Sequence, residues 1–498
     1  MSEAALLAVG RWGRLHWRLA LLLAVPVLLT GMSGTNYVFL AADTDYRCHI
    51  PECEEWPPAG PGAPAWGSWA LVDRCARRVS LDGRCTNASF SERSEPCARL
   101  VYLRPDSLVA QFQLGCREGR RALLGTAHNL GMFVSLPVMG YVSDRWGRRA
   151  ALVLAALGAG AAGGLKSWAP DYWSYAAAEL LEAAWGAGIY PAAFVLMIEW
   201  LSASQRALAS LALGVPLAAG GALLALLVPA TGSWRRAARL AYLPAALVLP
   251  YRWLLPDSAR WLAASGRAEE AARTVRRAAA WNRAPPPGPA AKLLGAAEPP
   301  GEGLWRAVRS SASVRRRLAV CGCWWASCVF VLYGLAVLAG AGRLSHAAPA
   351  LLAAAELPAL LLNTLLLERL GRRLLLRASC LLTAAACLLL PAVSAAGPWG
   401  AVSLLVVAKL GASMSINVLY VYSAELFPTS CRVRLLTLCS ALGRLASILA
   451  PLAPLLAAHG PWLPSVVFGT LPLGCAALTA LVPDTLRAAL PATLADLG

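Results

Sequence analysis

The chain has 498 residues, of which 58% are hydrophobic and 14% charged, and its formal net charge is +18. A mean hydropathy of +0.55 excludes an ordinary soluble domain and favours many apolar stretches of about 20 residues, the length of a helix that spans a bilayer. The positive charges lie in short runs between the apolar stretches. That distribution is typical of the positive-inside rule and argues against nucleic acid as a partner.

The first apolar run follows Arg11, Arg14 and Arg18 and continues from Leu19 to about Ala42. A secretory signal has an apolar core of only about 7–15 residues, so this longer run predicts the first membrane-spanning helix and not a signal peptide. Backbone groups inside lipid must be paired within the chain, which makes each span a helix. Residues 1–18 are therefore expected to form a cytoplasmic N-terminus.

Twelve transmembrane helices are expected in all. They lie near 19–41, 122–142, 150–168, 174–198, 207–229, 238–254, 318–340, 347–367, 374–395, 399–422, 435–458 and 464–482. An even number of spans places both termini on one side, and the arginine-rich segments place that side in the cytoplasm. The sequence thus predicts an all-α membrane protein with two six-helix halves, 19–254 and 318–483, and a cytoplasmic tail, 484–498.

The segment 42–121, between the first two spans, is expected to be an extracellular loop. An even number of cysteines in such a loop indicates three disulfides, for which fifteen pairings are possible. The loop also contains the sequon Asn87-Ala88-Ser89, so Asn87 is a candidate glycosylation site. Its six cysteines are Cys48, Cys53, Cys75, Cys85, Cys97 and Cys116.

The second long connection, 255–317, is expected on the cytoplasmic side, where residues 268–282 are typical of a surface helix and three prolines follow. The sequence contains no Walker A motif, no HExxH and no cluster of His and Cys ligands, so we expect no enzyme activity, cofactor or metal. GAGAAG at 158–163 matches a dinucleotide-binding pattern, but it lies inside a span. Small-residue packing between helices explains it better.

An internal repeat is the strongest signal in the chain. Three motif pairs recur in the same order, each pair separated by nearly the same number of residues. Such a repeat indicates a duplicated set of six helices, as in transporters whose halves are related by an axis along the membrane normal. The pairs are DRWGRR at 144 with ERLGRR at 368, Glu199…Arg206 with Glu425…Arg432, and PDSAR at 256 with PDTLR at 483.

All six motifs are expected at cytoplasmic helix ends. A carboxylate that pairs with arginines there can close the inner mouth when the two halves approach each other. Anchoring by the positive-inside rule alone would explain the arginines but not the acids at fixed offsets. The candidate gating residues are Asp144, Arg145, Arg148, Arg149, Glu199, Arg206, Glu368, Arg372, Glu425 and Arg432.

Four segments stand out along the chain: GYVSDRWGRR, YPAAFVLMIEWLSASQR, LPDSARWLAASGRAEEA, and LYVYSAELFPTSCRVR followed by RLASILAP. These segments resemble the solute carrier 22 family of organic cation, anion and zwitterion transporters. The resemblance runs from about residue 6 to residue 493 and implies the major facilitator fold, with uniport or exchange of organic ions by alternating access. We expect a monomeric transport unit in the plasma membrane, with a small organic ion and the lipid bilayer as partners.

The resemblance also implies substrate-binding residues. Members that handle anions usually carry arginine in the eleventh helix, where cation members have aspartate, and this chain has Arg444 there. Tyr333, Glu356 and Lys409 match a pocket aromatic in helix seven, an acidic position in helix eight and a basic position in helix ten. Ionisable residues inside a span are functional candidates because burying charge is costly. The alternative is that Arg444 forms a structural ion pair with Glu182 or Glu356.

The sequence departs from the family at some pocket positions. Leu360 stands where anion members often have lysine, Glu182 stands where the family has arginine in helix four, and Ile416 stands where an aromatic often lines the pocket. The leading hypothesis is a transporter of small organic ions, with anions favoured. The alternative is a non-transporting relative, which acts as a receptor or as a scaffold for the disulfide-bonded loop.

Overall fold

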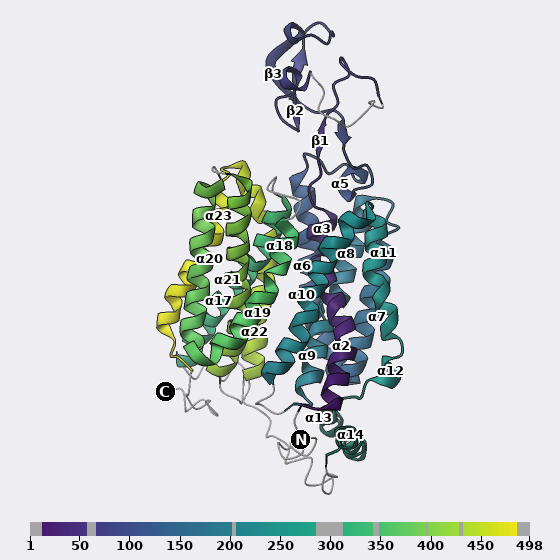
Figure 1. The fold of residues 1–498 in the computed structure, drawn as a ribbon, viewed down its shortest axis with the longest axis vertical. Helices are drawn as coiled ribbons and strands as arrows, with labels where there is room; N and C mark the ends of the chain where they lie inside the picture. The colour runs from purple at the N-terminus through teal and green to yellow at the C-terminus, as the bar shows by residue number, and fades with distance from the viewer. Residues whose placement is uncertain are drawn as a thin grey trace.

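The structure is a computed structural model that describes residues 12–56, 66–201, 206–284, 312–341, 348–394, 397–427 and 432–485. Its helices form a bundle of two halves that stand side by side, and a small domain projects from one end (Figure 1). We call the end that carries this domain the outer end. The opposite end, which carries α13 (Ala259–Ala264) and α14 (Ala268–Trp281), is the inner end.

Each half is built from helices that run between these two ends. The N-terminal half contains α2 (Arg14–Ser33), α3 (Asn36–Leu40), α6 (Glu118–Trp146), α7 (Arg148–Lys166), α8 (Tyr172–Gly186), α9 (Ile189–Ile198), α10 (Arg206–Thr231), α11 (Trp234–Tyr242), η3 (Leu243–Val248) and α12 (Tyr251–Leu254). The C-terminal half contains α17 (Ala312–Ala341), α18 (Ala348–Ala354), α19 (Glu356–Leu370), α20 (Arg372–Ser394), α21 (Pro398–Leu426), α22 (Arg432–Leu449), η4 (Ala450–Ala458), α23 (Leu463–Leu478) and η5 (Thr479–Leu481).

Eleven helical stretches among the described residues are long and apolar enough to cross a membrane, and each coincides with a predicted span. The sixth predicted crossing, 238–254, is the exception, because it is divided into α11, η3 and α12. Pro244 and Pro250 stand at these divisions. Proline lacks the backbone N–H that a continuous helix requires, so this crossing consists of three short pieces in line.

Small residues let the helices of the N-terminal half approach closely. A Cβ on Gly163 would come within 2.5 Å of the ring of Tyr242, and a Cβ on Gly158 would collide with the indole of Trp185. Both glycines belong to the GAGAAG segment of α7. The structure therefore supports helix packing, and not nucleotide binding, as the reason for this glycine pattern.

The outer loop departs from the predicted all-α fold. In it, β1 (Tyr46–Cys48) pairs antiparallel with β4 (Leu100–Tyr102), and β2 (Ala76–Ser80) pairs antiparallel with β3 (Phe90–Pro96). Segments this short bury too little apolar surface to show a clear hydrophobic period, and disulfides hold such small domains together instead. Its short helices are α4 (Gly67–Ala70), η1 (Asn87–Ser89) and α5 (Leu108–Gln111).

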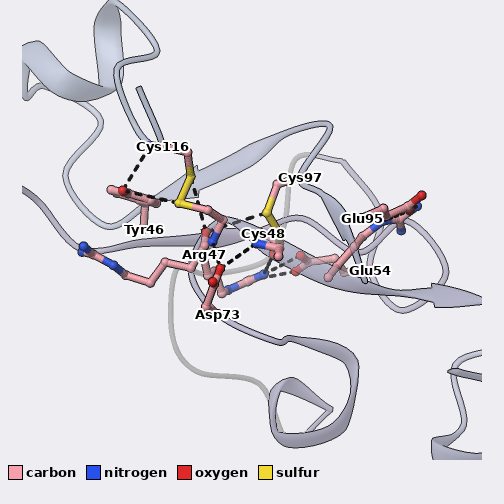
Figure 2. Close-up of a disulfide and its surroundings, with 12 residues drawn as sticks. Tyr46, Arg47, Cys48, Glu54, Asp73, Glu95, Cys97 and Cys116 are labelled. Atoms are coloured by element: carbon pink, nitrogen blue, oxygen red, sulfur yellow. Dashed lines mark hydrogen bonds and ion pairs between the residues drawn. A yellow bond between two sulfur atoms is a disulfide. The ribbon is translucent and has the colours of Figure 1, made fainter. Parts of the chain in front are cut away.

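The structure selects one of the fifteen possible disulfide pairings. The bonds are Cys48–Cys97, Cys53–Cys85 and Cys75–Cys116, with Cα–Cα distances of 5.4, 4.9 and 5.6 Å. The first bond lies beside the ion pair between Arg47 and Glu54 (Figure 2). The side chain of Asn87 is exposed at the surface of this domain, so glycosylation there stays a prediction that the geometry permits.

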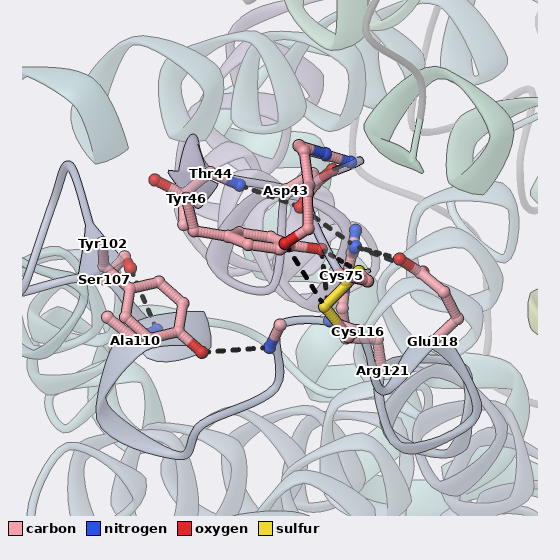
Figure 3. Close-up of polar contacts among 12 residues, drawn as sticks. Asp43, Thr44, Tyr46, Cys75, Tyr102, Ser107, Ala110, Cys116, Glu118 and Arg121 are labelled. Carbon is pink, nitrogen blue, oxygen red and sulfur yellow. Dashed lines mark hydrogen bonds and ion pairs between the residues drawn. A yellow bond between two sulfur atoms is a disulfide. The ribbon is translucent and has the colours of Figure 1, made fainter. Parts of the chain in front are cut away.

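The outer domain is tied to the start of α6. The carboxylate of Asp43 forms ion pairs with Arg74 at 2.9 Å and with Arg121 of α6 at 3.3 Å (Figure 3). The backbone N–H of Cys116, just before α6, donates to the hydroxyl of Tyr46 at 3.1 Å. These bonds and the Cys75–Cys116 disulfide fix both ends of the domain to the N-terminal half.

We expect the double substitution Cys75→Ser and Cys116→Ser to destabilise the outer domain. The bond closes a loop across a sequence separation of 41 residues, and opening such a loop removes about 4 kcal/mol of stabilisation in the chain-entropy model. Thermal melting of the purified protein measures the loss. Cys323→Ser is the matched control, because Cys323 is a free and exposed cysteine. A non-reducing peptide map with different cysteine partners would show that the pairing is wrong.

Candidate functional site

Arg444 occupies the interior of the C-terminal half. It lies in α22, is half-buried, and its Nη1 donates to the hydroxyl of Tyr333 in α17 at 3.0 Å. The two helices pack closely at Gly443, where a Cβ would stand 3.1 Å from the carbonyl oxygen of Trp325. Among the described residues, no carboxylate forms an ion pair with Arg444. Its described polar side-chain partner is therefore a neutral hydroxyl.

Lys409 and Glu356, two further predicted site residues, are paired with each other. Nζ of Lys409 in α21 lies 2.9 Å from Oε1 of Glu356 at the start of α19. The side chain of Lys409 is 5% exposed, whereas that of Glu356 is 32% exposed. This ion pair joins α21 to α19. Because each of the two charges already has a counter-charge, neither is as available to a ligand as the sequence analysis expected.

The alternative ion pair for Arg444 is not formed in this conformation. Glu356 is bound by Lys409, and Glu182 lies in the N-terminal half, where Nδ2 of Asn36 donates to it at 2.9 Å. Both glutamates that could have neutralised Arg444 therefore have other partners.

A cluster of buried ionisable residues in the N-terminal half was missed by the sequence analysis. Lys166 at the end of α7 has its Nζ 2.8 Å from Glu179 Oε2 and 3.7 Å from Glu182 Oε2, both in α8. His128 Nδ1 in α6 lies 2.8 Å from the other oxygen of Glu179. All four side chains are at most 1% exposed. We call His128, Lys166, Glu179 and Glu182 the buried charge cluster.

The sequence did contain a signal for the buried charge cluster. Glu179 and Glu182 are three residues apart, so they share one face of a predicted span, and acids inside a span are rare. His128, Glu179 and Glu182 also offer ligand atoms that lie within 4.8 Å of one another, as metal ligands do. However, the ammonium group of Lys166 already lies against both carboxylates, and it would repel a second cation there.

At the inner end, Arg148 is the centre of the first candidate gating motif. Its guanidinium donates to the carbonyl oxygen of Ser143 at 2.9 Å and pairs with Asp144 at 3.1 Å and Glu199 at 3.3 Å. Arg149 lies 3.7 Å from Asp257 of the PDSAR motif. Burial raises the pKa of the Asp257 carboxyl, and the guanidinium of Arg149 opposes that shift. The motifs that follow spans two, four and six are thus joined.

The C-terminal half repeats this arrangement. Arg372 donates to the carbonyl oxygen of Leu367 at 3.4 Å and pairs with Glu425 at 3.1 Å. Gly371 precedes it with φ +84°, as Gly147 precedes Arg148 with φ +95°, a backbone region that side chains with a Cβ disfavour. Arg145 is exposed. The side chains of Arg206, Glu368 and Arg432 lie outside the part of the chain that the structure describes.

The halves meet at the outer end. The hydroxyl of Thr126 in α6 donates to the carbonyl oxygen of Ile448 in α22 at 3.2 Å. A cavity of about 50 Å³ lies at this junction, and its lining includes Tyr37, Gly125 and Pro451. The described ion pairs of the inner motifs, in contrast, each join residues of the same half. The structure is therefore a conformation in which the outer end is closed.

We expect Glu199→Gln and Glu425→Gln to destabilise the protein more than Asp144→Asn. The side chain of Asp144 is 80% exposed and that of Glu199 only 13%. Exposed pairs contribute at most about 1 kcal/mol, whereas loss of a largely buried charged partner costs about 1–3 kcal/mol. Thermal melting of the three variants measures the difference. Equal shifts of the melting temperature for Asp144→Asn and Glu199→Gln would contradict the view that Glu199 contributes more to stability than Asp144 does.

Comparisons with known proteins agree with this architecture. Residues 110–451 match the model of the Major Facilitator Superfamily. The solved structure of the proton:xylose symporter XylE with 6-bromo-6-deoxy-D-glucose superimposes with a TM-score of 0.64 at 16% identity, over 97% of this chain and 98% of that chain. An inward open conformation of XylE from E. coli gives a TM-score of 0.65 at 15% identity, over 97% and 99%. At these identities the likeness shows the fold.

Sequence relatives match nearly the whole chain. Solute carrier family 22 member 6 from Mus musculus is 30% identical over 98% of this chain and 92% of that protein. Solute carrier family 22 member 3 from Rattus norvegicus is 28% identical over 99% and 95%, and the organic cation transporter protein of Drosophila melanogaster is 28% identical over 98% and 93%. The chain therefore belongs to the solute carrier 22 family of the major facilitator superfamily, a family of multi-pass membrane transporters and not of enzymes.

Proposed function

We propose that this protein moves small organic ions across the plasma membrane by alternating access, and that it prefers anions. Arg444 is the observation that carries the preference. Its guanidinium lies inside a membrane-spanning half, and no described carboxylate pairs with it. A charge in a low-dielectric interior is costly when it is unpaired, so an anionic ligand between the halves gains more from this site than a cation does.

The shape of the guanidinium favours particular anions. Its planar fork donates two parallel hydrogen bonds to a carboxylate or sulfonate, which a point charge cannot do. The hydroxyl of Tyr333, which accepts from Nη1 at 3.0 Å, holds the plane of Arg444 and leaves other N–H groups available. We therefore propose Arg444 as the primary anion contact and Tyr333 as the residue that orients it.

Alternating access is supported by the way that charge is distributed between the two ends. The described inner ion pairs brace each half internally, and the hydrogen bond between Thr126 and Ile448 joins the halves at the outer end. Two internally braced bodies that separate at one end and close at the other are the known mode of transporters with such repeats. In the opposite conformation, we propose that the arginines and acids of the inner motifs meet across the two halves.

The departures from the family pattern do not weaken this proposal. Glu182 is bound by Asn36 at 2.9 Å. Leu360 fills the junction of α10 with α19, where a Cβ on Gly214 would come within 2.5 Å of its methyl group. Leu360 therefore packs between two helices, and Glu182 is engaged within its own half and leaves Arg444 free of it. The alternative, a receptor or scaffold that presents the outer domain, is favoured only if transport is absent.

We expect Arg444→Lys to lower uptake of an aromatic carboxylate about tenfold, because the charge stays but one hydrogen bond of the fork is lost. Arg444→Asp should abolish anion uptake, since it reverses the sign of the charge at the proposed anion contact. Uptake of labelled benzoate-type carboxylates, sulfonates and quaternary ammonium ions into proteoliposomes measures both effects. Arg377→Lys is the matched control, because Arg377 is exposed on α20.

Two results would count against the proposal. Unchanged anion uptake by Arg444→Asp would remove Arg444 from the binding site. No uptake of any compound in the panel by correctly folded wild-type protein would favour the receptor or scaffold alternative instead.

A further inference from the structure

The buried charge cluster does not balance its charges. It contains two carboxylates, Glu179 and Glu182, and one ammonium group, that of Lys166. With a neutral imidazole at His128, the cluster carries one net negative charge. A net charge at a fully buried site is expensive because neither water nor lipid can solvate it.

The remaining side chains around the cluster supply no compensating positive charge. Asn36 of α3 donates to Glu182 at 2.9 Å and to the hydroxyl of Tyr242 in α11 at 2.6 Å. The ring of Tyr37 lies 5.0 Å from that of His128, and the Tyr175 hydroxyl belongs to the same helix as the two acids. These groups are an amide and three phenols. Among the described neighbours from α3, α6, α7, α8 and α11, only Lys166 and His128 are basic.

Two atoms of the cluster also lack a partner. Oε1 of Glu182 and Nε2 of His128 are fully buried and form no hydrogen bond with any described residue. Buried polar atoms are nearly always satisfied. A carboxylic acid group costs less to bury than a bare carboxylate does, so one added proton would relieve the charge imbalance of the cluster.

We propose that His128, Glu179 and Glu182 form a proton-binding site that holds one exchangeable proton while the outer end is closed. With that proton the cluster is neutral. The proton is shared through the 2.8 Å contact between His128 Nδ1 and Glu179 Oε1, and Lys166, at 2.8 and 3.7 Å from the two acids, stabilises the carboxylate that stays ionised.

The site has a route to water through Tyr37. This side chain contacts His128 on one side, and it lines the 50 Å³ cavity between the halves on the other, together with Gly125 and Pro451. Separation of the halves at this junction exposes Tyr37 and hydrates the cluster behind it. Since hydration lowers the cost of the net charge, the proton is released when the outer end opens. Occupancy of the site is thereby coupled to the conformation.

Thermal melting of the purified full-length protein between about pH 5 and pH 8 tests the site without any substrate. A glutamate in the unfolded chain loses its proton above about pH 4.3 and a histidine above about pH 6.5. The folded wild type keeps its extra proton beyond those values, so its stability falls as pH rises. Glu182→Gln leaves one carboxylate against one ammonium group and should not show this fall. The melting temperature of Glu182→Gln minus that of the wild type should therefore grow by about 4 °C or more across the range.

Glu199→Gln is the matched control, because it removes a largely buried acid whose partner, Arg148, stays charged at every pH of the range. It should lower the melting temperature by a similar amount at each pH.

A constant difference between Glu182→Gln and the wild type would overturn the proposal. So would a rise in the wild-type melting temperature with Zn²⁺ that Glu182→Gln lacks, since this would identify a metal site. Glu179→Gln also leaves a balanced cluster, and failure of both glutamine variants to fold at every pH would contradict a protonated acid. A failure of transport would affect none of these readings.

Discussion

Lipid hydrocarbon offers no counter-ions, so each charge within the bilayer must be balanced by the chain or by a ligand. The structure meets this constraint in three different ways. Lys409 and Glu356 form a simple pair. Lys166 is shared by two acids, and the remaining imbalance calls for a proton. Arg444 has only the hydroxyl of Tyr333 as its described side-chain partner. The better a charge is balanced within the chain, the more structural we take its role to be. By this measure the Lys409–Glu356 pair is the most structural of the three sites and Arg444 the most functional.

The duplicated motifs give the two halves similar internal bracing. Arg148 and Arg372 each bind a backbone carbonyl five residues earlier and an acid from the end of a different helix. This bracing stiffens the inner end of each half independently of the other. Under the proposed alternating access, each half moves as a body, and the contacts that change are those between the halves, among them the hydrogen bond between Thr126 and Ile448.

The sequence predicted the helices well because lipid imposes a length and a polarity that hydropathy records directly. It did not predict the breaks at Pro244 and Pro250, since the neighbours that compensate for lost hydrogen bonds lie on other helices. The pairing of six cysteines is likewise a matter of distances in space. The sequence showed that Glu182 is an unusual acid for its position. Its place beside Lys166, however, depends on how α7 packs on α8, and the order of residues along the chain does not give that distance. The family resemblance assigned Arg444 and Tyr333 to the pocket separately, and their hydrogen bond to each other was not predicted.

The attachment of the outer domain has a mechanical consequence. Asp43 and Arg121 hold its first residues, and the Cys75–Cys116 bond and Tyr46 hold its last, beside α6 of the N-terminal half. The C-terminal half contributes the weaker backbone hydrogen bond from the N–H of Asp43 to the carbonyl oxygen of Gly340 in α17, at 3.3 Å, and the side-chain ion pair and the disulfide outweigh it on the N-terminal half. The domain therefore travels with that half as a rigid handle and adds no hinge of its own. An antibody fragment bound to β2 and β3 would act as a lever arm on one half. A fluorescent label on that fragment, read against a second label on α18, would follow the opening of the outer end from a position well outside the translocation path.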